Sequence, residues 1–124
     1  MPKLTGFSAI SAITSERISD KISRRIVSGD QGMLVWWSVK AGAHAATHSH
    51  PHEQLVWVTA GLMDLRIGAE HRSCGPGDIA VIPGGVEHEV WFREDTEVVD
   101  VFSPPREDFL AGGPPPYMSA AAAP

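Results

Sequence analysis

The chain has 124 residues, enough for one domain around a single buried core. Its net charge is −5 and it contains no long run of Lys or Arg, so we expect no nucleic-acid partner. We also expect no membrane span, because no window approaches 18 apolar residues, and no signal peptide after Met1-Pro2-Lys3. Cys74 is the single cysteine, which excludes an internal disulfide and favours a cytoplasmic protein.

Residues 1–14 carry weak patterning and predict an N-terminal arm or an edge strand. From Ile18 onward, short apolar segments alternate with Gly, Pro and Asp turns, which is typical of an antiparallel barrel or sandwich. We therefore predict an all-β domain over residues 15–111, without a helix longer than about three turns. The predicted strands cover residues 18–27, Met33–Val39, 55–59, 62–67, 79–82, 87–93 and 97–102. Residues 112–124 contain mainly Gly, Pro and Ala and predict a disordered tail.

Two blocks carry side chains at metal-ligand spacing: Gly42-x5-His48-x-His50-x3-Gln54-x6-Gly61 and Gly77-x5-Pro83-x-Gly85-x2-His88. His48 and His50 are two residues apart, so both rings would project from one face of a strand. His88 would come from a separate strand. Neutral imidazoles are the commonest ligands for divalent transition metals in proteins, so the two blocks predict a metal site. The alternative is an exposed polar strand face without a ligand.

The predicted fourth ligand is Gln54, with Glu53 beside it. Three His and one Gln are uncharged when they bind, so a divalent ion would keep its full charge and attract an anionic ligand. This set favours Lewis-acid chemistry on a carboxylate-bearing substrate over oxygen activation. The sequence does not choose among Zn, Ni, Fe, Cu and Mn.

A second cluster of polar side chains lies in residues 100–109 (DVFSPPREDF). Asp100 and Phe102 share one strand face by parity, and Pro104-Pro105 would end the strand and fix the direction of Arg106. A carboxylate inside a barrel is costly unless it is paired or functional. Two interpretations stay open here: an Asp100–Arg106 salt bridge, or a substrate site in which Arg106 binds a carboxylate.

With their glycines and prolines, the two blocks resemble the two signature motifs of the cupin family. The resemblance implies a small antiparallel β-barrel of the jelly-roll type with a metal ion in its mouth. Cupins usually have Glu at the position of Gln54 and often Asn at the position of Phe92. The first departure bears on the chemistry of the site, and the second on packing.

Two segments, HSHPHEQ (48–54) and DVFSPPREDFL (100–110), are similar to the pectin-degradation cupins of the KdgF type. The resemblance implies a metal-dependent enzyme that opens 4,5-unsaturated uronate rings to linear ketouronates, with a small anionic sugar as substrate. It also implies a homodimer. The implied metal ligands are His48, His50, Gln54 and His88. The implied catalytic residues are Asp100 and Arg106, and the implied substrate-binding residues are Phe102 and Arg106.

Several alternatives remain at this point. The proton acceptor could be Asp100 or a metal-bound water. The same site could belong to a binding protein for sugar acids that catalyses nothing, or to a metal-dependent dioxygenase in which Glu53 replaces Gln54. The apolar segment Met33–Val39 could form a subunit interface or belong to the core.

Overall fold

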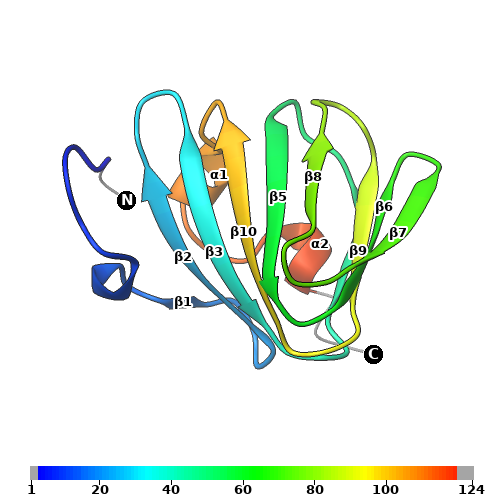
Figure 1. The fold of residues 1–124 in the computed structure, drawn as a ribbon. Coiled ribbons are helices and arrows are strands. Elements are labelled where there is room, and N and C mark those ends of the chain that lie inside the picture. Colours follow the sequence, from blue (N-terminus) through cyan, green and yellow to red (C-terminus); the bar gives the residue numbers. More distant parts are fainter. Residues whose placement is uncertain (1–2, 120–124) are drawn as a thin grey trace.

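The structure is a computed structural model that describes residues 3–119 (Figure 1). Two antiparallel sheets form a barrel-like sandwich, with six strands in the order β1-β2-β3-β10-β5-β8 and four in the order β4-β9-β6-β7. The first sheet contains β1 (Glu16–Arg17), β2 (Ile22–Ser28), β3 (Met33–Val39), β10 (Thr96–Ser103), β5 (Glu53–Ala60) and β8 (Ile79–Ile82). The second contains β4 (His44–His48), β9 (His88–Phe92), β6 (Met63–Ile67) and β7 (Glu70–Cys74). The predicted all-β antiparallel architecture is confirmed.

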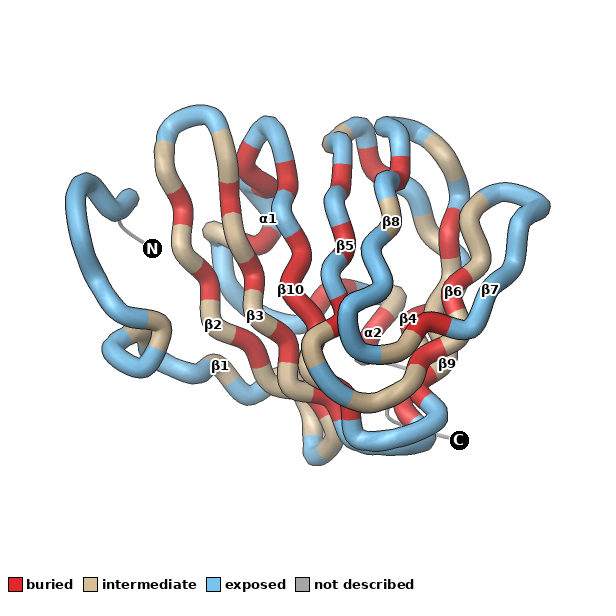
Figure 2. The backbone as a smooth tube through the Cα atoms, in the orientation of Figure 1, coloured by how far each residue is buried: buried red, intermediate tan, exposed pale blue. Residues whose placement is uncertain are grey.

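Side-chain alternation along the central strands builds the core. In β2 and β3 every second residue is buried, as the alternating colours of Figure 2 show. In β3 the inner positions include Val35 and Trp37, whereas Leu34 and Trp36 lie on the outer face. The apolar segment Met33–Val39 therefore contributes to the core and to the outer surface at once.

Strand β10 lies in the middle of the six-stranded sheet. It pairs with β3 on one side and with β5 on the other, so Asp100 lies opposite Val35 and Val56. Its inner residues Val98, Asp100 and Phe102 are buried. Pairing on both sides fixes the register of this strand, and hence the position of its one buried carboxylate.

Three strands, β1, β4 and β7, lie outside the predicted strand ranges, although the ligand spacing had predicted a strand at His48. For β4 and β7 the cause is the same. Both carry polar residues at most positions, so they lack the apolar alternation that identifies a strand in a sequence. They place His44 and His71 on the outer face of the four-stranded sheet, where both rings stack on Trp91.

The two ends of the described chain differ in packing. Residues 3–15 are mostly exposed and include only a short 3-10 helix, η1 (Ile10–Ala12). The C-terminal end forms two short helices, α1 (Glu107–Leu110) and α2 (Pro116–Ser119), on the inner side of the six-stranded sheet (Figure 1). None of the helices in residues 3–119 has the length and hydropathy to cross a bilayer.

The first part of the tail that we predicted for residues 112–124 packs against the barrel in this structure. Pro115 is buried, and Met118 belongs to the core. Gly113 is held by two hydrogen bonds, described below, and a composition of Gly, Pro and Ala does not reveal these contacts. Residues 120–124 of the predicted tail lie outside the described residues.

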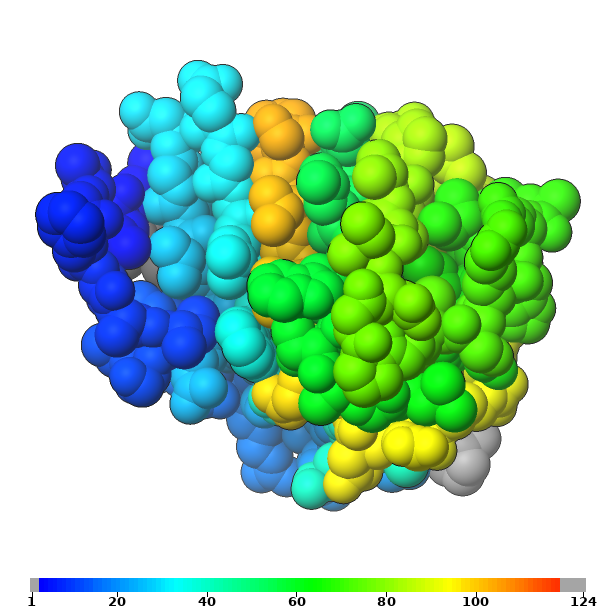
Figure 3. All heavy atoms as spheres, in the orientation of Figure 1, coloured from blue at the N-terminus to red at the C-terminus, as the bar shows by residue number. Residues whose placement is uncertain are grey.

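The outer face of the six-stranded sheet is apolar around its edge strand. Figure 3 shows β10, β5 and β8 side by side on this face, without a covering layer. Register places Leu55 beside Val81 and Trp57 beside Ile79. We call this surface the apolar outer face; its exposed large side chains are Leu55, Trp57, Ile79, Val81 and Val101.

Candidate metal centre and active site

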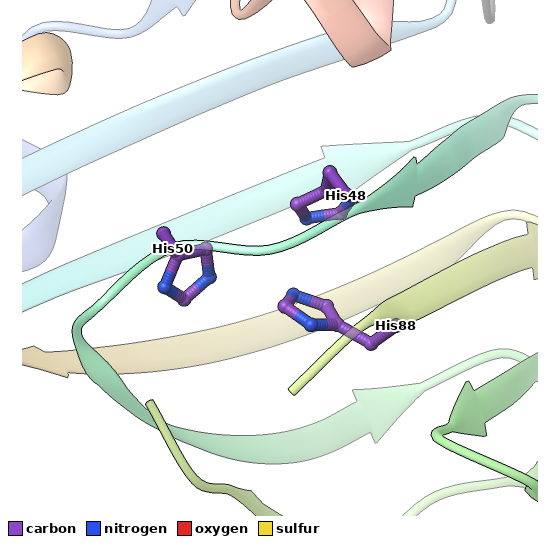
Figure 4. A group of neighbouring side chains, drawn as sticks. All are labelled: His48, His50 and His88. Atoms are coloured by element: carbon purple, nitrogen blue, oxygen red, sulfur yellow. The ribbon is translucent and has the colours of Figure 1, made fainter. Parts of the chain in front are cut away.

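Three histidines meet inside the barrel. His48 ends β4, His88 begins β9, and His50 lies in the loop between β4 and β5, with the three rings directed toward one another (Figure 4). One ring nitrogen from each lies within 4.8 Å of the others. The prediction that His48 and His50 share a strand is wrong in one detail, because β4 ends at His48. The loop nevertheless returns His50 to the same cluster.

A glycine turn brings the two motif loops together. The Gly85 N–H donates to the His50 carbonyl oxygen at 2.8 Å. A Cβ at Gly84 would lie 2.2 Å from the carbonyl oxygen of Pro51, so any side chain there would push the loops apart. Packing therefore requires a glycine at position 84, and Gly85 has a positive φ of 83°, so this turn can place His88 beside His50.

Backbone carbonyls orient two of the rings. His48 Nδ1 donates to the Ala46 carbonyl oxygen at 2.7 Å, and His88 Nδ1 donates to the Val86 carbonyl oxygen at 2.9 Å. With the proton on Nδ1, each Nε2 keeps its lone pair for a ligand. His88 Nε2 is buried and has no hydrogen-bond partner among the described residues. A buried acceptor without a partner is rare in proteins and fits a metal ligand.

His50 supports the same conclusion. Its Nδ1 lies 3.2 Å from the His52 carbonyl oxygen, and its Nε2 lies 3.1 Å from Gln54 Oε1. Burial lowers the pKa of His50 to about 4, so the ring is neutral at pH 7 and has one proton for two oxygen acceptors. Either tautomer leaves a lone pair facing an oxygen. A cation bound by Nε2 and Oε1 would relieve this repulsion, so the three His and Gln54 fit a divalent metal ion.

The lowered histidine pKa values predict how metal affinity depends on pH. Burial lowers the pKa of His48 and His50 to about 4, and it also lowers the pKa of His88. Protons compete with a metal only below the pKa of its ligands. We therefore expect zinc affinity to stay nearly constant from pH 8 to pH 5 and to fall steeply below about pH 4, when measured by equilibrium dialysis. A decline between pH 7 and pH 6, as for ordinary imidazoles, would contradict this prediction.

Asp100 lies in the same cavity as His48 and His88. Its Oδ2 accepts a hydrogen bond from Trp37 Nε1 at 3.0 Å, and the side chain of Gln54 also hydrogen-bonds to the carboxylate. Burial raises the pKa of Asp100 to about 6. The group is thus ionised at neutral pH, yet basic enough to accept a proton. Gln54 connects Asp100 to His50, a link that the sequence does not reveal.

Arg106 is buried and has a carboxylate partner other than Asp100. Its Nε and Nη2 donate to the two oxygens of Asp108 at 3.1 and 2.7 Å, and its guanidinium lies 3.8 Å from the centre of the Phe109 ring. The structure thus shows an Arg106–Asp108 ion pair where we had considered a pair with Asp100. Arg106 nevertheless lines the same cavity as Asp100.

Phe102 is only 1% exposed and supports the site from behind. Its ring meets those of His50 and Phe109 edge to face, at centroid distances of 5.6 and 5.5 Å.

Glu53 and Gln54 point to opposite sides of β5. Alternation along the strand leaves Glu53 exposed and buries Gln54. The side chain that a carboxylate-ligated oxygenase site would require therefore faces away from the histidines.

The cavity has a volume of about 50 Å³. Two residues of the C-terminal segment, Tyr117 and Met118, line it, and sequence reasoning missed both. The available signal was their isolation as large side chains in a run of Gly, Pro and Ala, one of them the only tyrosine of the chain. Predicted site residues in the lining are His48, Gln54, His88, Asp100, Phe102 and Arg106.

A two-sheet antiparallel barrel with a three-histidine cluster inside it is the architecture of the cupins. Residues 35–102 match the family described as Cupin domain, and the chain belongs to the cupin family. The chain is 35% identical over 98 residues to the pectin degradation protein KdgF of Dickeya dadantii, an alignment that covers 77% of this chain and 89% of that protein.

Two solved structures share the fold over nearly their whole length. The structure of KdgF from Halomonas sp. has a TM-score of 0.79 at 29% identity and covers 86% of this chain and 99% of its own. An RmlC-like cupin from Shewanella frigidimarina has a TM-score of 0.82 at 26% identity and covers 88% and 99%.

Proposed function

We propose that this protein is a metal-dependent enzyme that opens 4,5-unsaturated uronate monosaccharides to linear ketouronates in the breakdown of pectin or alginate. The observation that carries the proposal is the buried Asp100 carboxylate, which shares one small cavity with His48, His88 and Arg106. The similarity to a pectin degradation protein supports the proposed substrate class. The same proposal places the enzyme in the cytoplasm.

The residues that would hold the metal are His48, His50, Gln54 and His88. A divalent ion bound there would supply Lewis-acid stabilisation of negative charge on substrate oxygens, because four uncharged ligands do not reduce its charge. Candidate ions are Zn, Ni, Fe, Cu and Mn.

Asp100 would act as the general base. It removes the proton from the anomeric hydroxyl, so that C1 becomes a carbonyl and the bond between C1 and the ring oxygen breaks. The electron pair of that bond moves to the ring oxygen. This oxygen stays bonded to C5 and forms an enolate with the double bond between C4 and C5. Proton transfer to C4, from the newly protonated Asp100 or from water, gives the 5-keto product. The reaction is an isomerisation that needs no oxidant and no reductant.

Trp37 and Gln54 would hold Asp100 in place for this step. Both side chains donate hydrogen bonds to the carboxylate and oppose the rise in its pKa caused by burial. Asp100 therefore stays ionised at neutral pH while remaining a stronger base than an exposed aspartate. Arg106 would bind the carboxylate of the substrate, and Phe102 would support the sugar-binding wall of the cavity.

The test is to mix the metal-loaded protein with 4,5-unsaturated galacturonate and to follow the loss of its ultraviolet absorbance under anaerobic conditions. We expect acceleration over the spontaneous reaction, and loss of this acceleration in His48→Ala. The matched control is His71→Ala, because His71 lies exposed on the outer face of the sheet and should leave the rate unchanged. Binding without acceleration would identify a non-catalytic sugar-acid protein. A requirement for oxygen would identify an oxygenase.

We also propose a homodimer formed through the apolar outer face. Contiguous exposed apolar side chains on β5, β8 and β10 are typical of a protein interface, and a two-fold axis would pair this face with its copy. Sedimentation of the purified protein should give the mass of two chains, and a monomer at micromolar concentration would contradict the proposal.

A further inference from the structure

The C-terminal segment returns to the barrel and covers the histidine cluster. The Tyr117 ring stacks on the His48 ring, with centroids 3.6 Å apart and planes inclined by 3°. Met118, the next residue, is buried in the core, and α2 packs against β4. A tyrosine thus lies against a candidate metal ligand in the interior of the barrel.

Tyr117 also bonds to the guanidinium nitrogen of Arg106 that Asp108 does not contact. Arg106 Nη1 donates to the Tyr117 hydroxyl oxygen at 2.9 Å, while Nε and Nη2 donate to Asp108. Each of the three guanidinium nitrogens is therefore engaged. A carboxylate prefers two parallel N–H donors from one edge of a guanidinium. Asp108 occupies the edge formed by Nε and Nη2, so an incoming carboxylate has to bind at Nη1. To do so it would displace the Tyr117 hydroxyl from Nη1.

The size of the cavity leads to the same conclusion. Its volume of about 50 Å³ is far below the roughly 300 Å³ at which pockets begin to enclose small organic ligands. Tyr117 and Met118 form part of its wall, so their withdrawal would enlarge it. These two side chains therefore limit the size of the site in this structure.

The chain preceding Tyr117 has a pivot and a stiff arm. Gly112 and Gly113 both have positive φ values, of 83° and 85°, and an added Cβ at either would meet no atom within 4 Å. Three prolines follow, Pro114 to Pro116, and proline fixes φ near −65°. Rotation at the glycines would therefore move residues 114–119 as one piece.

Two side chains from the six-stranded sheet hold the pivot. Arg24 Nη2 donates to the Gly113 carbonyl oxygen at 2.9 Å, and the Gly113 N–H donates to Glu16 Oε2 at 3.1 Å. Arg24 and Glu16 also form an ion pair with each other at 2.8 Å. The start of the segment is thus anchored to the barrel at Gly113, and residues 114–119 lie beyond this anchor.

We propose that residues 114–119 form a lid over the metal centre and that Tyr117 is its latch. In the closed state Tyr117 binds Arg106 and covers His48. In the open state the substrate enters, and its carboxylate replaces the Tyr117 hydroxyl on Arg106. Only the identity of the entering anion rests on the proposed function; the lid itself would control access to the site for any ligand.

The first test uses Tyr117 as its own reporter, because it is the only tyrosine in the chain. Zinc-loaded protein containing 3-fluorotyrosine should give one 19F resonance from this ring. Addition of saturated D-galacturonate, which cannot react, should move that resonance toward the position of an exposed tyrosine. An unchanged resonance, with binding of galacturonate shown by calorimetry, would overturn the latch. Absence of galacturonate binding would count against the proposed substrate class. The second test would then decide whether residues 114–119 form a lid.

The second test measures access to the metal in the full-length chain. A lid limits uptake and loss of zinc equally, so Tyr117→Ala should raise both rates about tenfold and leave the dissociation constant unchanged. Tyr117→Phe keeps the ring on His48 and removes only the hydroxyl. Its rates of zinc uptake and loss should therefore lie between those of the unmodified protein and those of Tyr117→Ala. Phe7→Ala, on the exposed N-terminal arm, is the matched control and should behave as the unmodified protein. Unchanged rates, or faster loss alone with weaker affinity, would overturn the lid.

Discussion

Asp100→Asn is expected to lower turnover of unsaturated galacturonate by a factor of 10² to 10⁴ while the metal stays bound, because proton transfer by a positioned base contributes about that much. Asn has nearly the shape of Asp and can still accept the hydrogen bond from Trp37 Nε1, so the cavity should keep its form. It cannot accept the anomeric proton. The measurement is the initial rate of absorbance loss, with zinc content determined by elemental analysis on the same sample.

Asp64→Asn is the matched control for this substitution. Asp64 is on β6 and bonds to Ser73 and Arg93 on the outer face of the other sheet, so it should not affect the rate. Full activity of Asp100→Asn with one metal per chain would show that another group, such as a water, accepts the proton. Loss of the metal together with activity would assign Asp100 a structural role through its hydrogen bond to Gln54.

Arg24→Ala should cost about 3 kcal/mol of unfolding free energy, an effect of the size found when a large buried side chain or one partner of a buried ion pair is removed. Arg24 is only 1% exposed. Its guanidinium lies over the rings of Phe109 and Trp37, at 4.7 and 5.5 Å from their centres, and its Nε bonds to Glu16. The substitution therefore removes packing, an ion pair and the anchor of Gly113 together. Urea denaturation followed by tryptophan fluorescence would measure the loss.

Arg25 provides the comparison, since it is the next residue on the same strand but is directed to the other face. It is half-buried and donates one hydrogen bond, to the Ile13 carbonyl oxygen at 3.1 Å. Arg25→Ala should cost about 1 kcal/mol, the value of a typical hydrogen bond. Equal losses for the two variants would show that the buried position of Arg24 contributes nothing to stability.

Sequence analysis identified the strands whose apolar residues show, by their positions, which side chains are buried. In Met33–Val39 and Ile79–Ile82 the predicted limits agree with the structure, because apolar runs bounded by Gly, Pro and Asp leave little choice. β7 (EHRSC) was missed, since its register depends on pairing with β6 rather than on its own side chains. Local patterns do not encode such tertiary pairing.

The site shows the same division. The two metal-ligand blocks and the segment around Asp100 could be recognised along the chain, because each block or segment has its own local spacing of residues. The contacts made by Trp37, Arg24 and Tyr117 could not, since they join residues far apart in sequence. The Trp37–Asp100 hydrogen bond crosses between neighbouring strands, and the Arg24–Gly113 bond spans 89 residues. Arg24 also breaks the expectation that an arginine on a strand faces water.

The central position of β10 divides the site into two parts of different local stability. Amides of a strand paired on both sides exchange with solvent only when the whole domain opens, whereas short terminal elements open alone at little cost. Asp100 and the framework around it belong to the first class, and Arg106, α1 and α2 lie beyond the last residue of β10. Mild denaturant should therefore release Arg106 and the two helices before Asp100 loses its place. Such an enzyme would lose its hold on the substrate carboxylate while its base was still in position.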